Sequence, residues 1–194
     1  MKYKYLIDAG KAHLEKYPGY EPVSHPSKIF HMGTTIFHVG ATMFPMGAKW
    51  MYDRLNELDG DNIRPFDPRI NYNFYGCLKY GACLSGAFLA TWWLQRHGPL
   101  LMPLSMLLFY LIEIQFLFLF PLLIDNARHP ILTGIREVFR IGVIKCLFTV
   151  IPISIFMMTG LLRKKDMFRN WYIGCLSILI WYNHEVRNRT SSSF

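Results

Sequence analysis

Cysteine is scarce in this 194-residue sequence, and its spacing excludes the common cysteine-based sites. The four cysteines form no CxxC pair of the kind that zinc ligands and redox pairs use. All four lie inside long apolar segments, where a cysteine behaves as a small apolar side chain. We therefore expect neither disulfides nor metal ligands and interpret all of them as packing residues: Cys77, Cys83, Cys146 and Cys175.

Familiar catalytic motifs are also missing. The sequence contains no HExxH, no GxSxG, no P-loop, no DxxD pair and no clustered histidines of the desaturase kind. Each of these patterns gathers metal ligands, a nucleophile or a phosphate-binding loop in one place, so their absence removes the usual grounds for assigning an enzyme class. We expect a protein that is not an enzyme.

Acidic residues are few, with 13 against 21 Lys and Arg, for a formal net charge of +8. Such a balance can indicate nucleic-acid binding, but no basic stripe interleaved with aromatics stands on a soluble module here. We interpret the basic residues as charges that orient membrane segments, and expect no nucleic-acid partner. Residues 1–15 carry Asp8 and Glu15 and lack an apolar core, so we expect no cleavable signal peptide and a first span that acts as its own insertion signal.

Apolar residues are abundant, at 52% of the chain with 16% aromatic, and they are bunched into long runs. Residues 74–95, 100–124 and 141–162 each exceed the roughly 20 residues that a helix needs to cross a bilayer. Residues 168–182 form either a fourth, short span or an interfacial helix. The pattern predicts an all-α, polytopic helical membrane protein with about four transmembrane helices, within a range of three to five.

The charge distribution predicts the orientation of these spans. Most Lys and Arg residues outside the spans fall on the side that holds the N-terminus, so both termini should lie on the cytoplasmic or matrix face. The chain is expected to divide into four parts: an amphipathic helix with a Pro-rich arm (1–28, the helix over 3–16), a glycine-repeat helix (29–59), a polar loop (60–73) and the transmembrane domain (74–194).

A seven-residue phrase repeats three times in residues 29–49, as IFHMGTT, IFHVGAT and MFPMGAK. Seven residues are nearly two helical turns, so the glycines line one face of a helix. Glycine costs about 1 kcal/mol in a helix interior, and close approach of a neighbouring helix is the usual compensation in membranes. Residues 29–46 either span the bilayer or lie along it. Small residues of the first span offer a matching face, and the predicted packing positions are Gly33, Gly40, Gly47, Gly81, Ser85 and Gly86.

Two histidines of the repeat, His31 and His38, suggest a more specific hypothesis, in which they are axial ligands to haem or another tetrapyrrole. Seven residues of helix separate them by about 10 Å, so they cannot share one ion, and a metal site needs three or four converging ligands. The alternative is that both are packed or interfacial side chains, and we expect no protein-bound cofactor other than phospholipid.

Polar residues inside the apolar runs are costly in hydrocarbon and mark a function or a pair. Glu113 lies near the middle of its span with Gln115 beside it, as a protonation site, a lipid-headgroup base or a neutral carboxyl bonded to Thr149, Ser154 or a partner subunit. Lys79 and Lys145 are expected to snorkel toward the positive face. Basic residues at the span ends are either orienting flanks or sites for anionic lipid such as cardiolipin: Arg128, Arg136 and Arg140 on one face, Arg163, Lys164, Lys165 and Arg169 on the other.

Residues 128–134, RHPILTG, resemble the RHPxYxG signature of integral-membrane methyltransferases of the isoprenylcysteine and phosphatidylethanolamine type. The resemblance implies that this segment helps to hold S-adenosylmethionine. The sequence departs from the signature at Leu132, which replaces the tyrosine, and NHEVR at 183–187 stands where the family has paired glutamates. The alternative is an Arg-rich interfacial loop in which Pro130 starts a helix.

These patterns favour a non-catalytic accessory subunit of a large multisubunit membrane complex, which packs through small-residue helix faces and binds lipid at its basic rims. We hypothesise that the compartment is the mitochondrial inner membrane, with both termini in the matrix, and that the complex is a respiratory-chain complex or ATP synthase. The alternatives are a methyltransferase-like enzyme carrying the partial RHPxxxG motif and a small tetrapyrrole-binding membrane subunit.

Overall fold

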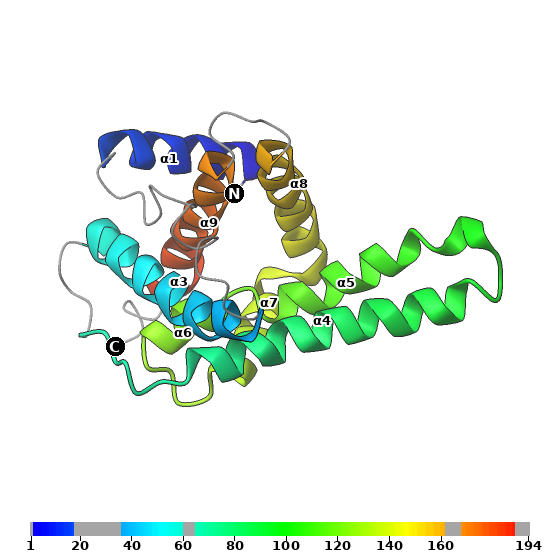
Figure 1. The fold of residues 1–194 in the computed structure, drawn as a ribbon. Helices are drawn as coiled ribbons and strands as arrows, with labels where there is room; N and C mark the ends of the chain where they lie inside the picture. Colours follow the sequence, from blue (N-terminus) through cyan, green and yellow to red (C-terminus); the bar gives the residue numbers. More distant parts are fainter. Residues whose placement is uncertain (1, 18–35, 60–64, 162–167, 189–194) are drawn as a thin grey trace.

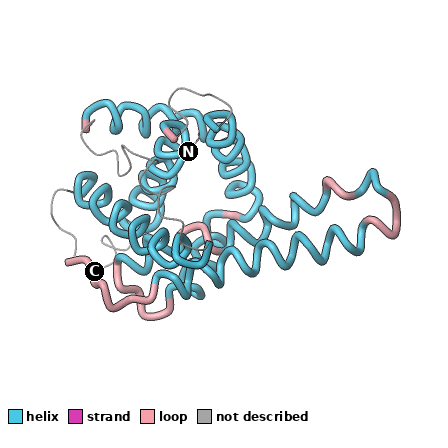
Figure 2. Tube along the Cα trace, in the orientation of Figure 1, coloured by secondary structure: helices cyan, strands magenta, loops and turns pink. Residues whose placement is uncertain are grey.

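The computed structural model describes residues 2–17, 36–59, 65–161 and 168–188, and within these ranges the chain is all-helical, with no strand. Figure 2 shows helix along most of the described residues, with loops and turns between successive helices. The helices are α1 (Tyr3–Lys16), α3 (Ile36–Asp59), α4 (Tyr72–Leu94), α5 (Leu104–Gln115), α6 (Leu119–Ile124), α7 (Pro130–Ile141), α8 (Val143–Leu161) and α9 (Arg169–Tyr182). A 3-10 turn, η1 (Pro99–Leu101), precedes α5, and a π-helical turn, η2 (Asn183–Arg187), follows α9.

Among the described residues, two helical stretches are long and apolar enough to cross a membrane, Pro99–Ile124 and Val143–Gly160. The first matches the predicted span 100–124, although half of its apolar window is buried inside the protein, including all six residues of α6. The second begins later than the predicted 141–162, because α7 runs on to Ile141 and Gly142, at φ 102°, ends it. Neither α4 nor α9 meets the same length and composition.

The helices form a compact body and one long projection (Figure 1). The projection is the antiparallel hairpin of α4 and α5, whose tip at residues 95–103 lies farthest from the body. The body contains α1, α3, α6, α7, α8 and α9, and α8 and α9 run across the direction of the hairpin instead of alongside it. The helices that correspond to the predicted spans therefore run in two directions.

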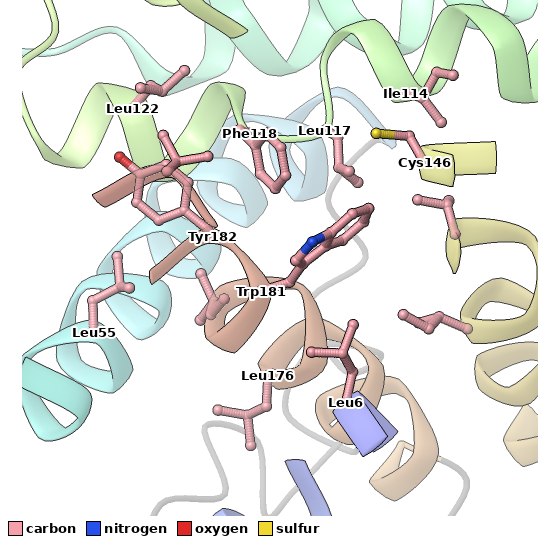
Figure 3. Packing of buried hydrophobic residues seen from close by; sticks show 14 of the residues in the cluster. Leu6, Leu55, Ile114, Leu117, Phe118, Leu122, Cys146, Leu176, Trp181 and Tyr182 are labelled. Atoms are coloured by element: carbon pink, nitrogen blue, oxygen red, sulfur yellow. The ribbon is translucent and has the colours of Figure 1, made fainter. Parts of the chain in front are cut away.

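The centre of the body is α9, which contacts α1, α3 and α8. Trp181 and Leu176 are at most 1% exposed, and the Trp181 ring meets Phe118 edge to face with 5.6 Å between centroids (Figure 3). From Ile173 to Tyr182, α9 thus packs in the core, which accounts for the apolar composition of this part, whereas Phe168 and Trp171 are exposed. Cys146 is fully buried in the same cluster, as expected of a small packing residue.

The N-terminal helix closes this core. The predicted helix over residues 3–16 is present as α1, and its Leu6 is fully buried against α9. The Ser177 hydroxyl donates to the Leu6 carbonyl at 3.0 Å, so the two backbones approach closely. At this crossing Gly10 faces the backbone of α9, and a Cβ at residue 10 would lie only 2.9 Å from the Ile173 carbonyl oxygen.

This approach makes Gly10→Ala a destabilising substitution. We expect the change to reduce the free energy of unfolding by about 1–3 kcal/mol, because the backbone carbonyl of Ile173 cannot move aside as a side chain could. The matched control is Gly47→Ala, since a Cβ there meets nothing within 4 Å and helix propensity favours alanine by up to about 1 kcal/mol. Thermal unfolding of both variants in detergent, followed by circular dichroism, measures the difference. Equal melting temperatures would contradict the close approach.

Candidate functional site

The main candidate site is the apolar outer face of the α4–α5 hairpin, which nothing in the described part of the chain covers. Leu100 is 92% exposed and Phe88 is 71% exposed, which is unusual for residues of this kind. Between Gly81 and Ile112 the only formal charge is Arg96, at the tip. We call this face the hairpin surface; it consists of Leu84, Phe88, Leu89, Trp92, Trp93, Leu100, Leu104 and Met106.

The α4 side of the hairpin tip carries polar residues next to two tryptophans. The Arg96 guanidinium stacks on the ring of Trp92 at 3.8 Å, and His97 lies against Trp93 with 4.5 Å between ring centroids. Tryptophan and arginine together are typical of the boundary between hydrocarbon and water, where the indole lies at headgroup level. The hairpin therefore has an apolar shaft and an end suited to an interface.

A second apolar face lies on α8. Its exposed residues, Ile144, Phe148, Ile155 and Met158, follow one another at intervals of three to seven positions, so they share one side of the helix. The adjacent Lys145 does not simply snorkel as predicted. Its Nζ lies 3.5 Å from the carboxylate of Glu185, a residue that is 6% exposed.

An ion pair joins the two helices of the hairpin near its base. Lys79 is 9% exposed and its Nζ lies 3.9 Å from Glu113 Oε1. The predicted snorkelling of Lys79 is thus wrong, because Glu113 on α5 offers a partner that the sequence spacing did not suggest. Thr149, one of the partners expected for Glu113, donates instead to the Lys145 carbonyl at 2.8 Å. Gln115 donates to the Leu111 carbonyl in its own helix, at 3.5 Å.

The predicted packing glycines have different surroundings. Gly86 lies at the contact between α4 and α5, where Ile112 occupies the space of a Cβ. Gly47 and Gly81 face open space within the described part of the protein, and Ser85 is exposed. The close approach of α3 to α4 occurs at Gly76, where a Cβ would lie 2.5 Å from the Phe44 ring. The packing role of Gly76 was not predicted from the sequence, because its partner is an aromatic side chain and not a second small residue.

Several predicted residues lie outside what the structure describes. These are His31 and Gly33, together with Arg163, Lys164 and Lys165. His38 and Gly40 fall within α3, but their side-chain surroundings are likewise outside the described part.

Metal and haem binding gain no positive support from the geometry. Among the described residues no group of three or more His, Cys, Asp and Glu side chains could hold a metal ion. The haem hypothesis depends on His31 and His38, so it stays a prediction.

The basic residues of the rims divide into paired and unpaired groups. Arg140 donates to Glu137 and, at 2.7 Å, to the Glu185 carbonyl, while Arg169 lies 3.5 Å from Glu15. Arg128 and Arg136 are exposed and make no ion pair with the part of the chain that is described. These two retain free charge for an external anion.

The methyltransferase-like segment spans the turn between α6 and α7. Pro130 starts α7 as expected and Leu132 is exposed. Gly134 is buried, and a Cβ at this position would lie 3.5 Å from the Gln115 carbonyl oxygen. The NHEVR segment forms η2, directly after α9. In the described residues no hydrogen bond or ion pair joins Arg128 to η2, so the RHPILTG and NHEVR segments do not form a shared site there.

The turn η2 instead anchors the C-terminal end of the body. Arg187 bridges two carboxylates, Asp59 at the end of α3 and Asp125 at the end of α6, at 3.0 Å in the second case. The Tyr182 hydroxyl donates to Asp125 at 2.5 Å, and Asn183 donates to Asp59 at 2.7 Å. This network holds three helix ends together.

An open groove of about 460 Å³ lies at the base of the hairpin. Asn71 and Phe74 from the start of α4 form one wall, and the α6–α7 turn with Asn126 and Arg128 forms the other. We call it the basal groove; it is lined by Ile70, Asn71, Phe74, Tyr75, Leu123, Asn126, Ala127, Arg128 and Pro130. Beside it, burial and the nearby Asp67 carboxylate raise the pKa of Tyr72 to about 12.

Comparisons of the chain with protein-family models, with curated proteins and with solved structures found no match. The functional argument therefore rests on the surfaces and side chains described above.

The ion pair at the hairpin base can be tested by a double-mutant cycle. We expect Lys79→Met and Glu113→Met each to lower the free energy of unfolding by about 2 kcal/mol, because each leaves a largely buried charge without its partner. The double variant should lose less than the sum of the two, since it removes both charges. Unfolding in mixed micelles with increasing denaturing detergent measures the three differences. Strictly additive losses would show that the two charges do not interact.

Proposed function

We propose that this chain is a non-catalytic accessory subunit of a multisubunit membrane complex, anchored in the bilayer by the α4–α5 hairpin. The observation that carries the proposal is the hairpin surface, a continuous apolar face on an element that projects from the body. Eight large apolar side chains lie on it, and full burial of such a side chain is worth about 1.5–3 kcal/mol. Covering the surface with lipid is thus favourable by on the order of 10 kcal/mol.

The dimensions of the hairpin are compatible with crossing the bilayer. From Lys79 to Leu94, α4 extends about 22 Å at 1.5 Å per residue. An amphipathic helix at the interface sinks about 5–10 Å into the membrane. If α8 is that interfacial helix, the base of the hairpin starts about 5–10 Å below the membrane surface. The roughly 22 Å of α4 then reach most of the way across the hydrocarbon core of about 30 Å. The polar tip then reaches the far headgroups.

This orientation differs from the predicted four side-by-side spans. Because α8 runs across the hairpin, the two cannot both stand upright in one flat bilayer (Figure 1). We propose that the hairpin crosses the membrane and α8 lies along the surface, with Ile144, Phe148, Ile155 and Met158 toward the lipid. Both α1 and α9 then lie on one side, in agreement with the predicted common side for the two termini.

A subunit role is supported by glycine positions on two helices that no described residue of this chain packs against. Gly47 on α3 and Gly81 on α4 have no neighbour within 4 Å of a Cβ, although glycine is unfavourable in a helix. A helix of another subunit, packed closely at small residues, would account for both. Our hypothesis for the compartment remains the mitochondrial inner membrane, as part of a respiratory-chain complex or ATP synthase, with the basic body in the matrix and anionic phospholipid at its rim.

The bilayer anchor predicts a strong effect of charge on the hairpin surface. We expect Phe88→Arg to release much of the protein from membranes on carbonate washing, because arginine near the bilayer centre costs about 2.5–3.5 kcal/mol on an insertion scale. Phe88→Leu is the matched control and should stay in the membrane fraction. Full retention of Phe88→Arg would contradict insertion of this face.

The subunit role predicts stoichiometric co-purification in mild detergent. We expect Gly47→Leu to lose partner proteins from the purified complex, because leucine blocks close approach at α3, while a Cβ at this position meets nothing within 4 Å in the described part of the chain itself. Gly47→Ala, the smaller change, should retain more of the partners. If the wild-type protein purifies as a lone monomer from its native membrane, the subunit proposal is wrong.

A further inference from the structure

The basal groove combines a positive wall with an apolar wall. Arg128 and Asn126 stand on the α6–α7 turn, and Phe74, which is 58% exposed, stands opposite on α4. A groove of about 460 Å³ lies within the range of pockets that hold small ligands. Its two walls suit a ligand with an anionic end and an apolar end.

Within the described residues, no carboxylate balances the positive charge of this groove. Arg128 makes no ion pair with any residue the structure describes, and no carboxylate lines the groove. The neighbouring Asp125 is engaged elsewhere, since it accepts from Tyr182 and pairs with Arg187. The groove also borders the start of α7, where His129 provides no side-chain cap and the first turn holds no acidic residue. Both features favour an anion beside Arg128.

The apolar wall continues along α4 in the direction of the tip. Phe74 and Leu78 are one turn apart and both exposed, and Ser85 and Leu89 continue the same side of the helix. At Ser85 and Leu89, bordered by Leu84 and Phe88, a second open depression of about 440 Å³ follows the helix. Residues 74 and 89 are about 22 Å apart along the axis, close to the length of an extended acyl chain.

We propose that the basal groove binds one anionic phospholipid, with its phosphate at Arg128 and one acyl chain along Phe74, Leu78 and the depression at Ser85. The proposal rests on the membrane orientation given above, in which the base of the hairpin lies at headgroup level. An arginine suits this role because its planar guanidinium donates two parallel hydrogen bonds to phosphate oxygens. Asn126 adds an amide on the same wall.

The test uses the full chain in nanodiscs of phosphatidylcholine with a minor fraction of phosphatidylglycerol, followed by native mass spectrometry of the released protein. The wild type should retain one phosphatidylglycerol preferentially. Arg128→Gln should weaken that retention about tenfold, because it removes a charge-assisted hydrogen bond. Asn126→Gly, which suits the positive φ of 55° at this residue, should weaken it less while keeping the fold.

The control is Arg69→Gln, which removes the same charge from an exposed residue just outside the groove. We expect this variant to retain phosphatidylglycerol like the wild type. Equal losses in Arg69→Gln and Arg128→Gln would overturn the proposal in favour of diffuse surface charge. Displacement of the lipid by inorganic phosphate alone would also overturn it, because the site would then recognise only the anion. Failure of the wild type to enter nanodiscs would instead contradict the membrane anchor.

Discussion

The burial of α9 is the constraint on which the rest of the molecule depends. Its side chains meet α1 on one side, α8 on another and the Phe118 turn at its end, so a single 14-residue helix fills the centre of the body. The Arg187 network then fixes the ends of α3 and α6 directly beyond it. Because α6 is entirely buried, the α5 helix of the hairpin leads directly into the core. The hairpin can therefore project as a rigid element and need not hang from a flexible loop.

Rigidity within the hairpin comes from contacts that are unusual for a membrane element. Ile112 fills the space beside Gly86, and the Lys79–Glu113 pair lies below it, between the same two helices. An ion pair at this position is costly to desolvate, so it is better regarded as a device that fixes the register of α4 against α5 than as a source of stability. Its place at the base, near the expected headgroup level, reduces that cost.

Much of the secondary structure could be predicted from the sequence, because apolar runs and proline–glycine interruptions act locally. The helix over 3–16, the start of α7 at Pro130 and the two long apolar stretches follow from such local signals. The packing of the helices against one another could not be predicted from these local signals. Most of the apolar residues from Ile173 to Tyr182 lie inside the protein, and composition alone does not distinguish burial in a core from burial in lipid.

The candidate site likewise has features that follow from the local sequence and features that depend on long-range packing. The hairpin surface and the basic character of Arg128 follow from the sequence, but the groove that brings Arg128 close to Phe74 joins residues more than fifty positions apart. The Lys79–Glu113 pair and the Arg187 bridge are likewise long-range contacts, for which a single sequence offers no periodic signal. Gly76 was missed for a related reason, since its partner is a side chain of another helix and not a second small residue.

The small size of the hairpin tip has a consequence for how the protein reaches its membrane. In the proposed orientation only the segment from Gln95 to Pro103 passes to the far side, and Arg96 is its single formal charge. Every ion pair in the body forms on the near side, in water, before or after insertion. In that orientation, insertion of the hairpin would require the translocation of one short loop, and the body described above would assemble on the near side of the membrane.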